Sequence, residues 1–133
     1  MKKLDNFKEE KKMATHKQAV PPPTVFFGAE AFQPIDHTEV RWLGSGGMFV
    51  NTRGTCIMMD PMLKDFDMPL LIDMPIAPEN ILHLDAVLIT HCDNDHYSVP
   101  SLHAMEHVSK TFHGPHYVAE LMQAEGFPAN GHT

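Results

Sequence analysis

The chain has 133 residues, of which 43% are hydrophobic, and its net charge is −7 at pH 7. This length allows one domain with a substantial core and is too short for two comfortable ones. The acidic balance argues against a nucleic-acid partner, because such proteins present a basic surface, whereas an acidic body attracts cations.

The first 24 residues are expected to form a flexible basic tail and a spacer. Residues 1–20 carry a charge of +3, whereas residues 21–133 carry −10. The lysines could mark a membrane-binding or nucleic-acid-binding arm, but the acidic residues between them favour a solvated tail or a frayed helix. The prolines of "AVPPPT" (19–24) predict an extended spacer. The folded domain is therefore expected over residues 25–133.

Targeting signals are not evident in the sequence. No apolar run approaches the roughly 18 residues of a membrane-spanning helix, and the N-terminus lacks the apolar core of a secretory signal. Cys56 and Cys92 do not make a disulfide framework, which fits a reducing compartment. We therefore expect a cytoplasmic protein without a transmembrane segment.

The first part of the domain predicts an antiparallel meander. Short apolar runs at 39–43, 48–52 and 55–60 are separated by "GSGG" (44–47) and "RG" (53–54). "GSGG" could suggest a phosphate-binding loop, but it precedes no helix, so a tight turn is expected. Four prolines in residues 61–80 predict a long irregular loop.

The second part predicts alternating strands and helices. Residues 86–90 are apolar on both faces, as in a buried strand. Apolar residues at helical spacing predict helices over 99–110 and 115–127, with a short strand at 111–115 between them. A meander followed by this alternation indicates the α/β fold class.

Potential metal ligands are concentrated in "THCDNDHYS" (90–98), directly after the predicted buried strand. Alternate residues of an extended segment point the same way, so His91, Asp93 and Asp95 could converge, with His96 approaching from the neighbouring face. Cys92 is a further potential ligand, although the spacing points it away. The alternative is that Asp93 to Asp95 form only a turn that caps the next helix. Histidines at both ends of the cluster favour a metal site.

"DAVLITHCDNDHYSVPSL" resembles the metal-binding signature of the metallo-β-lactamase superfamily, whose motif is His-x-His-x-Asp-His after a buried strand. Together with "WLGSGGMFVNTRGTCIMMDP" and "ILHLDAVLITH", it is most similar to the branch that contains the L-ascorbate-6-phosphate lactonases and the N-acyl-phosphatidylethanolamine phospholipases D. The resemblance covers roughly residues 39–128. It implies an αβ/βα sandwich, of which residues 25–133 would form the N-terminal half.

The resemblance also implies site residues and a metal cofactor. His91 and position 93 would bind a first metal ion, and Asp95 and His96 a second; Asp95 would also orient the attacking water as a catalytic residue. Asp60 matches an aspartate that buttresses the metal loop from behind, or else simply ends a strand at a turn. Position 93 is Asp where the family has its second histidine, and a carboxylate favours manganese, iron or magnesium. We expect a divalent ion, zinc or manganese.

The implied function is metal-dependent hydrolysis of a lactone, a phosphodiester or a related small-molecule ester. The family's second half, with its further histidines and bridging aspartate, has no counterpart in the sequence up to "NGHT". The alternative is therefore a non-catalytic metal-binding or interaction module. In either case the sheet would need a covering layer, either by self-association or by pairing with a C-terminal half.

Other histidines are expected to have ordinary roles. "HAMEH" (103–107) matches the His-x-x-Glu-His pattern of inverted zinc peptidases, with Glu106 as the possible base. The predicted helix is short and no third ligand is evident, so a solvated helix face is expected. His113, His116 and His132 are expected to be surface groups.

Overall fold

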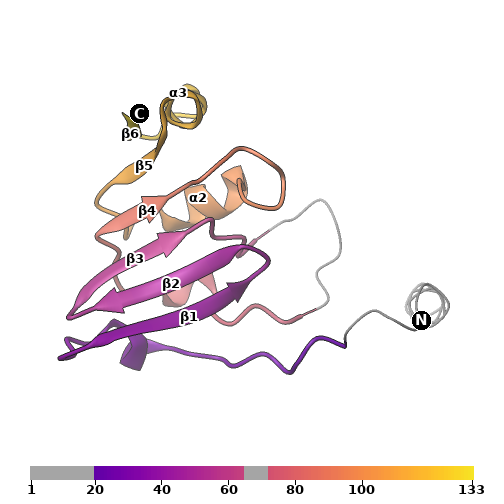
Figure 1. Cartoon of the computed structure of the whole chain (residues 1–133), viewed down its shortest axis with the longest axis vertical. Coiled ribbons are helices and arrows are strands. Elements are labelled where there is room, and N and C mark those ends of the chain that lie inside the picture. Colours follow the sequence, from indigo (N-terminus) through magenta and orange to yellow (C-terminus); the bar gives the residue numbers. More distant parts are fainter. Residues whose placement is uncertain (1–19, 65–71) are drawn as a thin grey trace, which may run out of the picture.

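The structure, a computed structural model, describes residues 20–64 and 72–133 (Figure 1). This part of the chain contains a six-stranded sheet with the strand order β1-β2-β3-β4-β5-β6. The expected tail over residues 1–19 and part of the loop expected over 61–80 lie outside the described residues.

The first three strands form an antiparallel meander, as the sequence predicts. They are β1 (Thr38–Gly44), β2 (Gly47–Thr52) and β3 (Thr55–Met59). The turn between β1 and β2 is tight, and Gly44 and Ser45 both have positive φ, at 93° and 50°. Such backbone angles are typical of short hairpin turns. The "GSGG" stretch is therefore a hairpin turn, as expected.

The remaining strands are parallel to β3 and alternate with helices, which confirms the α/β class. The elements are β4 (Ala86–Leu88), α2 (Val99–Met105), β5 (Phe112–Pro115), α3 (His116–Ala124) and β6 (Ala129–His132). Two short 3-10 helices, η1 (Ala29–Phe32) and η2 (Pro78–Asn80), precede β1 and β4. No helix in residues 20–64 and 72–133 has the length and apolar character to cross a membrane.

Several element ends and one strand differ from the sequence-based prediction. The helix predicted over 115–127 spans only His116–Ala124. The strand predicted over 86–90 ends as regular strand at Leu88, and the helix predicted over 99–110 ends at Met105. Strand β6 was not predicted, because "ANGH" contains turn-forming Asn and Gly and only one apolar residue. It forms because it pairs in parallel with β5, from Phe112 opposite Ala129 to Pro115 opposite His132.

One face of the sheet is buried in the core. Phe49, Met58, Val87 and Phe112, one from each of four consecutive strands, are at most 2% exposed. They belong to the same buried cluster as Leu102 and Met105 of α2 and Val118 and Met122 of α3. The hydrophobic core therefore lies between the sheet and these helices.

The opposite face of the sheet is also apolar but is only partly covered. Strand register places Val40, Val50, Ile57 and Ala86 in one row and Trp42, Met48, Met59 and Leu88 in the next. All eight are half-buried or exposed, and Val40 and Trp42 are 54% and 51% exposed. We call these eight residues the open apolar face. Adjacent apolar rows of this kind commonly bind another layer.

Buried serines attach helix α2 to the segment that follows β3. Ser98 caps α2 by accepting a hydrogen bond from the Ser101 backbone N–H. The Ser101 hydroxyl oxygen accepts the backbone N–H groups of Leu63 and Lys64, each at 3.0 Å. Because α2 follows the histidine cluster and Leu63 follows Asp60, these bonds fix the two sides of the candidate site relative to each other.

Candidate metal centre

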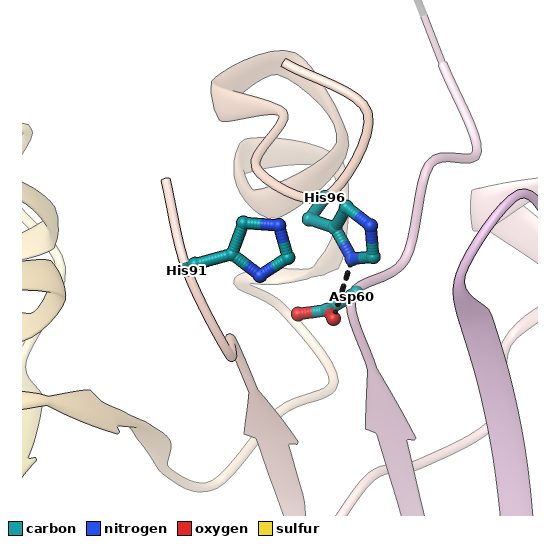
Figure 2. Close-up of side chains that lie close together, drawn as sticks. All are labelled: Asp60, His91 and His96. Atoms are coloured by element: carbon teal, nitrogen blue, oxygen red, sulfur yellow. Dashed lines mark hydrogen bonds and ion pairs between the residues drawn. The ribbon is translucent and has the colours of Figure 1, made fainter. Parts of the chain in front are cut away.

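The candidate site lies where the adjacent parallel strands β3 and β4 end (Figure 2). Asp60 follows β3, and Thr90 and His91 follow β4. The backbone N–H of Asp60 donates to the carbonyl of Leu88 at 2.9 Å, which continues the strand pairing to the edge. Carboxyl ends of parallel strands are the usual location of ligand sites in α/β proteins.

The carboxylate of Asp60 is the most buried acidic group of the site. Its residue is 3% exposed and has a positive φ of 46°, a conformation that Asp tolerates better than most residues. Asp60 Oδ1 accepts the backbone N–H of Thr90 at 2.7 Å. Asp60 Oδ2 accepts the Thr90 hydroxyl at 2.6 Å and is 2.8 Å from His96 Nδ1. Three donors therefore satisfy this buried carboxylate.

These hydrogen bonds determine which nitrogen of His91 carries a proton. Thr90 has one hydroxyl hydrogen, and it is donated to Asp60. The Thr90 oxygen, 2.8 Å from His91 Nδ1, can therefore only accept, so Nδ1 must carry the hydrogen. In the neutral ring, Nε2 of His91 is then an unprotonated nitrogen with its lone pair free to bind a metal ion.

His96 has the same tautomer as His91. Its Nδ1 faces the acceptor oxygen of Asp60, so Nδ1 is the donor and Nε2 carries the lone pair in the neutral ring. The two imidazole rings lie beside each other with centroids 4.0 Å apart (Figure 2). Metal-binding histidines commonly donate their other N–H to a carboxylate or another oxygen, which is the arrangement found here.

Two exposed carboxylates are next to these nitrogens. Asp93 Oδ2 lies 3.5 Å from His91 Nε2, and Asp95 Oδ2 lies 3.5 Å from His96 Nε2. Bonds of about 2.0–2.2 Å to one ion place neighbouring ligand atoms about 3–3.5 Å apart. Donor atoms of His91, Asp93 and Asp95 also all lie within 4.8 Å of one another, as do those of Asp60, His91 and His96. The donor set therefore fits a divalent cation.

Asp60 orients the side chains of the site. Both of its oxygens already accept hydrogen bonds from Thr90 or His96. These bonds fix the tautomers of the two histidines. One buried carboxylate thus supports a cluster whose outer side chains are those of His91, Asp93, Asp95 and His96.

The β1–β2 turn contacts the loop of residues 91–96, a contact that the sequence does not predict. The Ser45 hydroxyl donates to the carbonyl of Asp95 at 3.2 Å. A Cβ atom added to Gly46 would lie 2.2 Å from His96 Cε1, so a side chain here would displace the ring. Gly46 therefore gives the His96 ring its space, and "GSGG" contributes to the site as well as forming a turn.

The loop of residues 91–96 folds as a short turn. The backbone N–H groups of His96 and Tyr97 both donate to the carbonyl of Asp93 at 2.9 Å. Helix α2 is capped by Ser98 and not by the side chains of Asp93 to Asp95, which were the alternative caps. Cys92 packs against the hydrophobic core.

Tyr97 follows His96 and is held in its neutral form. Burial raises the pKa of the Tyr97 hydroxyl, and electrostatic interaction with Glu125 and Cys92 raises it further. The phenol is therefore protonated at neutral pH and contributes no anionic ligand.

The peptidase-like "HAMEH" residues are arranged differently from a metal site. His103 Nδ1 lies 3.1 Å from Glu106 Oε1, and the His103 ring packs against Phe127 with centroids 4.6 Å apart. Among the described residues, no group of three metal donors within 4.8 Å includes His103, Glu106 or His107.

Comparison with known proteins identifies the fold. No protein-family model and no curated protein matches the chain. Among solved structures it is similar to a novel metallo hydrolase from the hyperthermophilic archaeon Ignicoccus hospitalis, with 22% identity and a TM-score of 0.53. It shares its fold with part of a metal-dependent hydrolase.

Two further solved structures are similar in fold to this chain. The chain is similar to a possible metal-dependent hydrolase from Veillonella parvula, with 20% identity and a TM-score of 0.55. It is also similar to an isothiocyanate hydrolase from Delia radicum gut bacteria, with 22% identity and a TM-score of 0.54. In these three comparisons the match covers 71–72% of this chain and only 40–41% of the other. The chain therefore spans less than half the length of these hydrolases.

The Thr90 hydroxyl provides a direct test of the geometry. Thr90→Val keeps the side-chain shape but removes the donor to Asp60 and the acceptor for His91, so zinc affinity is expected to fall about 10–100-fold. Competition against a chromogenic chelator measures this change. Thr52→Val is the matched control, because the Thr52 hydroxyl bonds Thr38 at the exposed end of the meander. Equal affinities of Thr90→Val and wild type would contradict the orienting role.

Proposed function

We propose that this chain forms the metal-binding part of a metal-dependent hydrolase of the metallo-β-lactamase superfamily. The observation that carries the proposal is the hydrogen-bond network of Asp60 and Thr90, which in the neutral rings of His91 and His96 places both Nε2 lone pairs beside Asp93 and Asp95. The similarity in fold to solved metal-dependent hydrolases supports it.

Each residue of the site has a proposed role. His91 and Asp93 would hold one ion, and Asp95 and His96 a second, with Asp60 orienting both histidines. Their nitrogen and carboxylate donors suit zinc or manganese, and the carboxylate at position 93 shifts the preference towards the harder ion. The charge of −10 over residues 21–133 favours a cation near the site.

A divalent ion held there would act as a Lewis acid and lower the pKa of a water, which supplies a hydroxide near neutral pH. The Asp95 side chain is 52% exposed, so its carboxylate can accept a hydrogen bond from that water and direct it. The His91 side chain is 45% exposed, which leaves the site open to a substrate in solution. A lactone, a phosphodiester or a related ester is the proposed substrate class, following the lactonase and phospholipase D resemblance.

The second candidate function is a non-catalytic metal-binding or interaction module. The observations that favour it are the open apolar face and the match to only 40–41% of the solved hydrolases. A shaped catalytic cavity needs walls on all sides, and the described residues supply one sheet with helices on one face. We therefore expect catalysis to require a further layer, from a C-terminal half or a second chain.

Measurement of metal content tests metal binding, the property that the two candidate functions share. The wild-type chain, dialysed after incubation with zinc or manganese, is expected to retain more metal than the variant with His91→Ala and His96→Ala. The two substitutions remove both unprotonated nitrogens of the site, so retention is expected to fall by at least about tenfold. The paired change His103→Ala and His107→Ala is the control, since it removes two histidines from α2 and the turn after it. Equal metal content in wild type and the His91/His96 variant would exclude this site.

Catalytic turnover distinguishes the hydrolase from the non-catalytic module. The chain alone, supplied with manganese or zinc, is expected to show no hydrolysis of a generic phosphodiester or lactone above background, and to self-associate in light scattering through its open apolar face. A compact monomer whose metal-dependent turnover is lost in Asp95→Ala would contradict this and indicate a complete hydrolase.

A further inference from the structure

A second pair of histidines lies on the last two strands, apart from the candidate metal centre. His113 of β5 and His132 of β6 have ring centroids 5.1 Å apart, and His113 Nδ1 is 2.9 Å from His132 Nε2. His113 is half-buried and His132 is exposed. The sequence analysis treated both as separate surface groups, so their contact is a finding of the structure.

The tautomer of His113 follows from its other neighbour. The Thr111 hydroxyl donates its one hydrogen to the carbonyl of Asp85 at 2.9 Å. The Thr111 oxygen, 2.9 Å from His113 Nε2, must then accept, so Nε2 of His113 carries the hydrogen. The lone pair of neutral His113 is therefore on Nδ1, the atom that faces His132.

This is the arrangement that holds a metal-binding histidine in place: one ring nitrogen donates to a fixed oxygen while the other is free to bind an ion. The strands also hold the two rings together, because β5 and β6 are hydrogen-bonded over the whole of both elements. Without an ion, His132 satisfies the lone pair of His113 by donating its own Nε2 hydrogen.

From this geometry we propose that His113 Nδ1 and His132 Nε2 form a second site for a divalent transition-metal ion that favours imidazole. Two bonds of about 2.0–2.1 Å at a tetrahedral angle place the nitrogens about 3.3 Å apart, so the present 2.9 Å contact must open slightly to admit the ion. The hydrogen on His132 Nε2 then moves through solvent to Nδ1 of the same exposed ring, which leaves the Nε2 lone pair for the ion. Water completes the coordination. Zinc, nickel and copper suit this donor pair, whereas manganese favours carboxylates.

The site is independent of the proposed hydrolase centre. It uses different residues on different strands, and in the described chain His113 and His132 belong to neither of the donor groups that include His91. It can therefore be tested in a chain that lacks the first site.

The experiment measures zinc binding by calorimetry in the full chain carrying His91→Ala and His96→Ala. Zinc is expected to bind this variant, and the binding is expected to be lost when His113→Ala or His132→Gln is added. Thr111→Val is expected to weaken it about tenfold, because the fixed tautomer is lost. His116→Ala is the matched control: His116 is an exposed histidine at the start of α3, beside Glu120 at 3.2 Å, and its removal should leave zinc affinity unchanged.

A second measurement needs no further substitution in the His91/His96 variant, so its result does not depend on whether the additional variants fold. Nitrogen NMR of labelled histidine rings in the His91/His96 variant is expected to show zinc-dependent shifts at Nδ1 of His113 and Nε2 of His132, with no comparable shift at His116. Absence of zinc binding in that variant, or binding that persists after His113→Ala, would overturn the proposal. Zinc-dependent shifts confined to other histidines would overturn it equally.

Discussion

The Asp60 carboxylate is the group on which the site depends. It lies at the end of β3, yet its hydrogen-bond partners belong to the residues after β4, with Thr90 and His96 separated from it by 30 and 36 positions. A buried acceptor that loses its donor costs about 1–3 kcal/mol, so each partner keeps the others in place. One carboxylate therefore joins two strands to the loop of residues 91–96 and orients both imidazole rings at once.

The open apolar face lies on the same sheet as the candidate site. The sheet is covered by helices on one face, while its other face carries two rows of half-buried or exposed apolar residues next to the site. The fold corresponds to 40–41% of the solved hydrolases it resembles. The candidate metal site and the uncovered face are thus linked, because a layer packed on that face would also add a wall to the site.

Sequence reasoning predicted the elements whose signal is local and missed those that depend on distant contacts. The meander, β4 and both helices follow from apolar spacing, and the ligand cluster is visible because its members lie within six positions. Thr90 and Gly46 were missed, since their importance comes from Asp60 and His96 across the fold. The pairing of His113 with His132 was missed for the same reason: it requires β6, whose sequence has almost no strand propensity of its own.

We propose that the network of Asp60 and Thr90 presents Nε2 of His91 and His96 as free metal ligands. Nitrogen NMR of isotope-labelled histidine rings, recorded on the chain before and after addition of zinc, tests it most directly. Both rings are expected to be protonated at Nδ1 in the metal-free neutral form, and zinc is expected to shift the Nε2 resonances of both. Rings protonated at Nε2, or Nε2 resonances that do not respond to zinc, would contradict it.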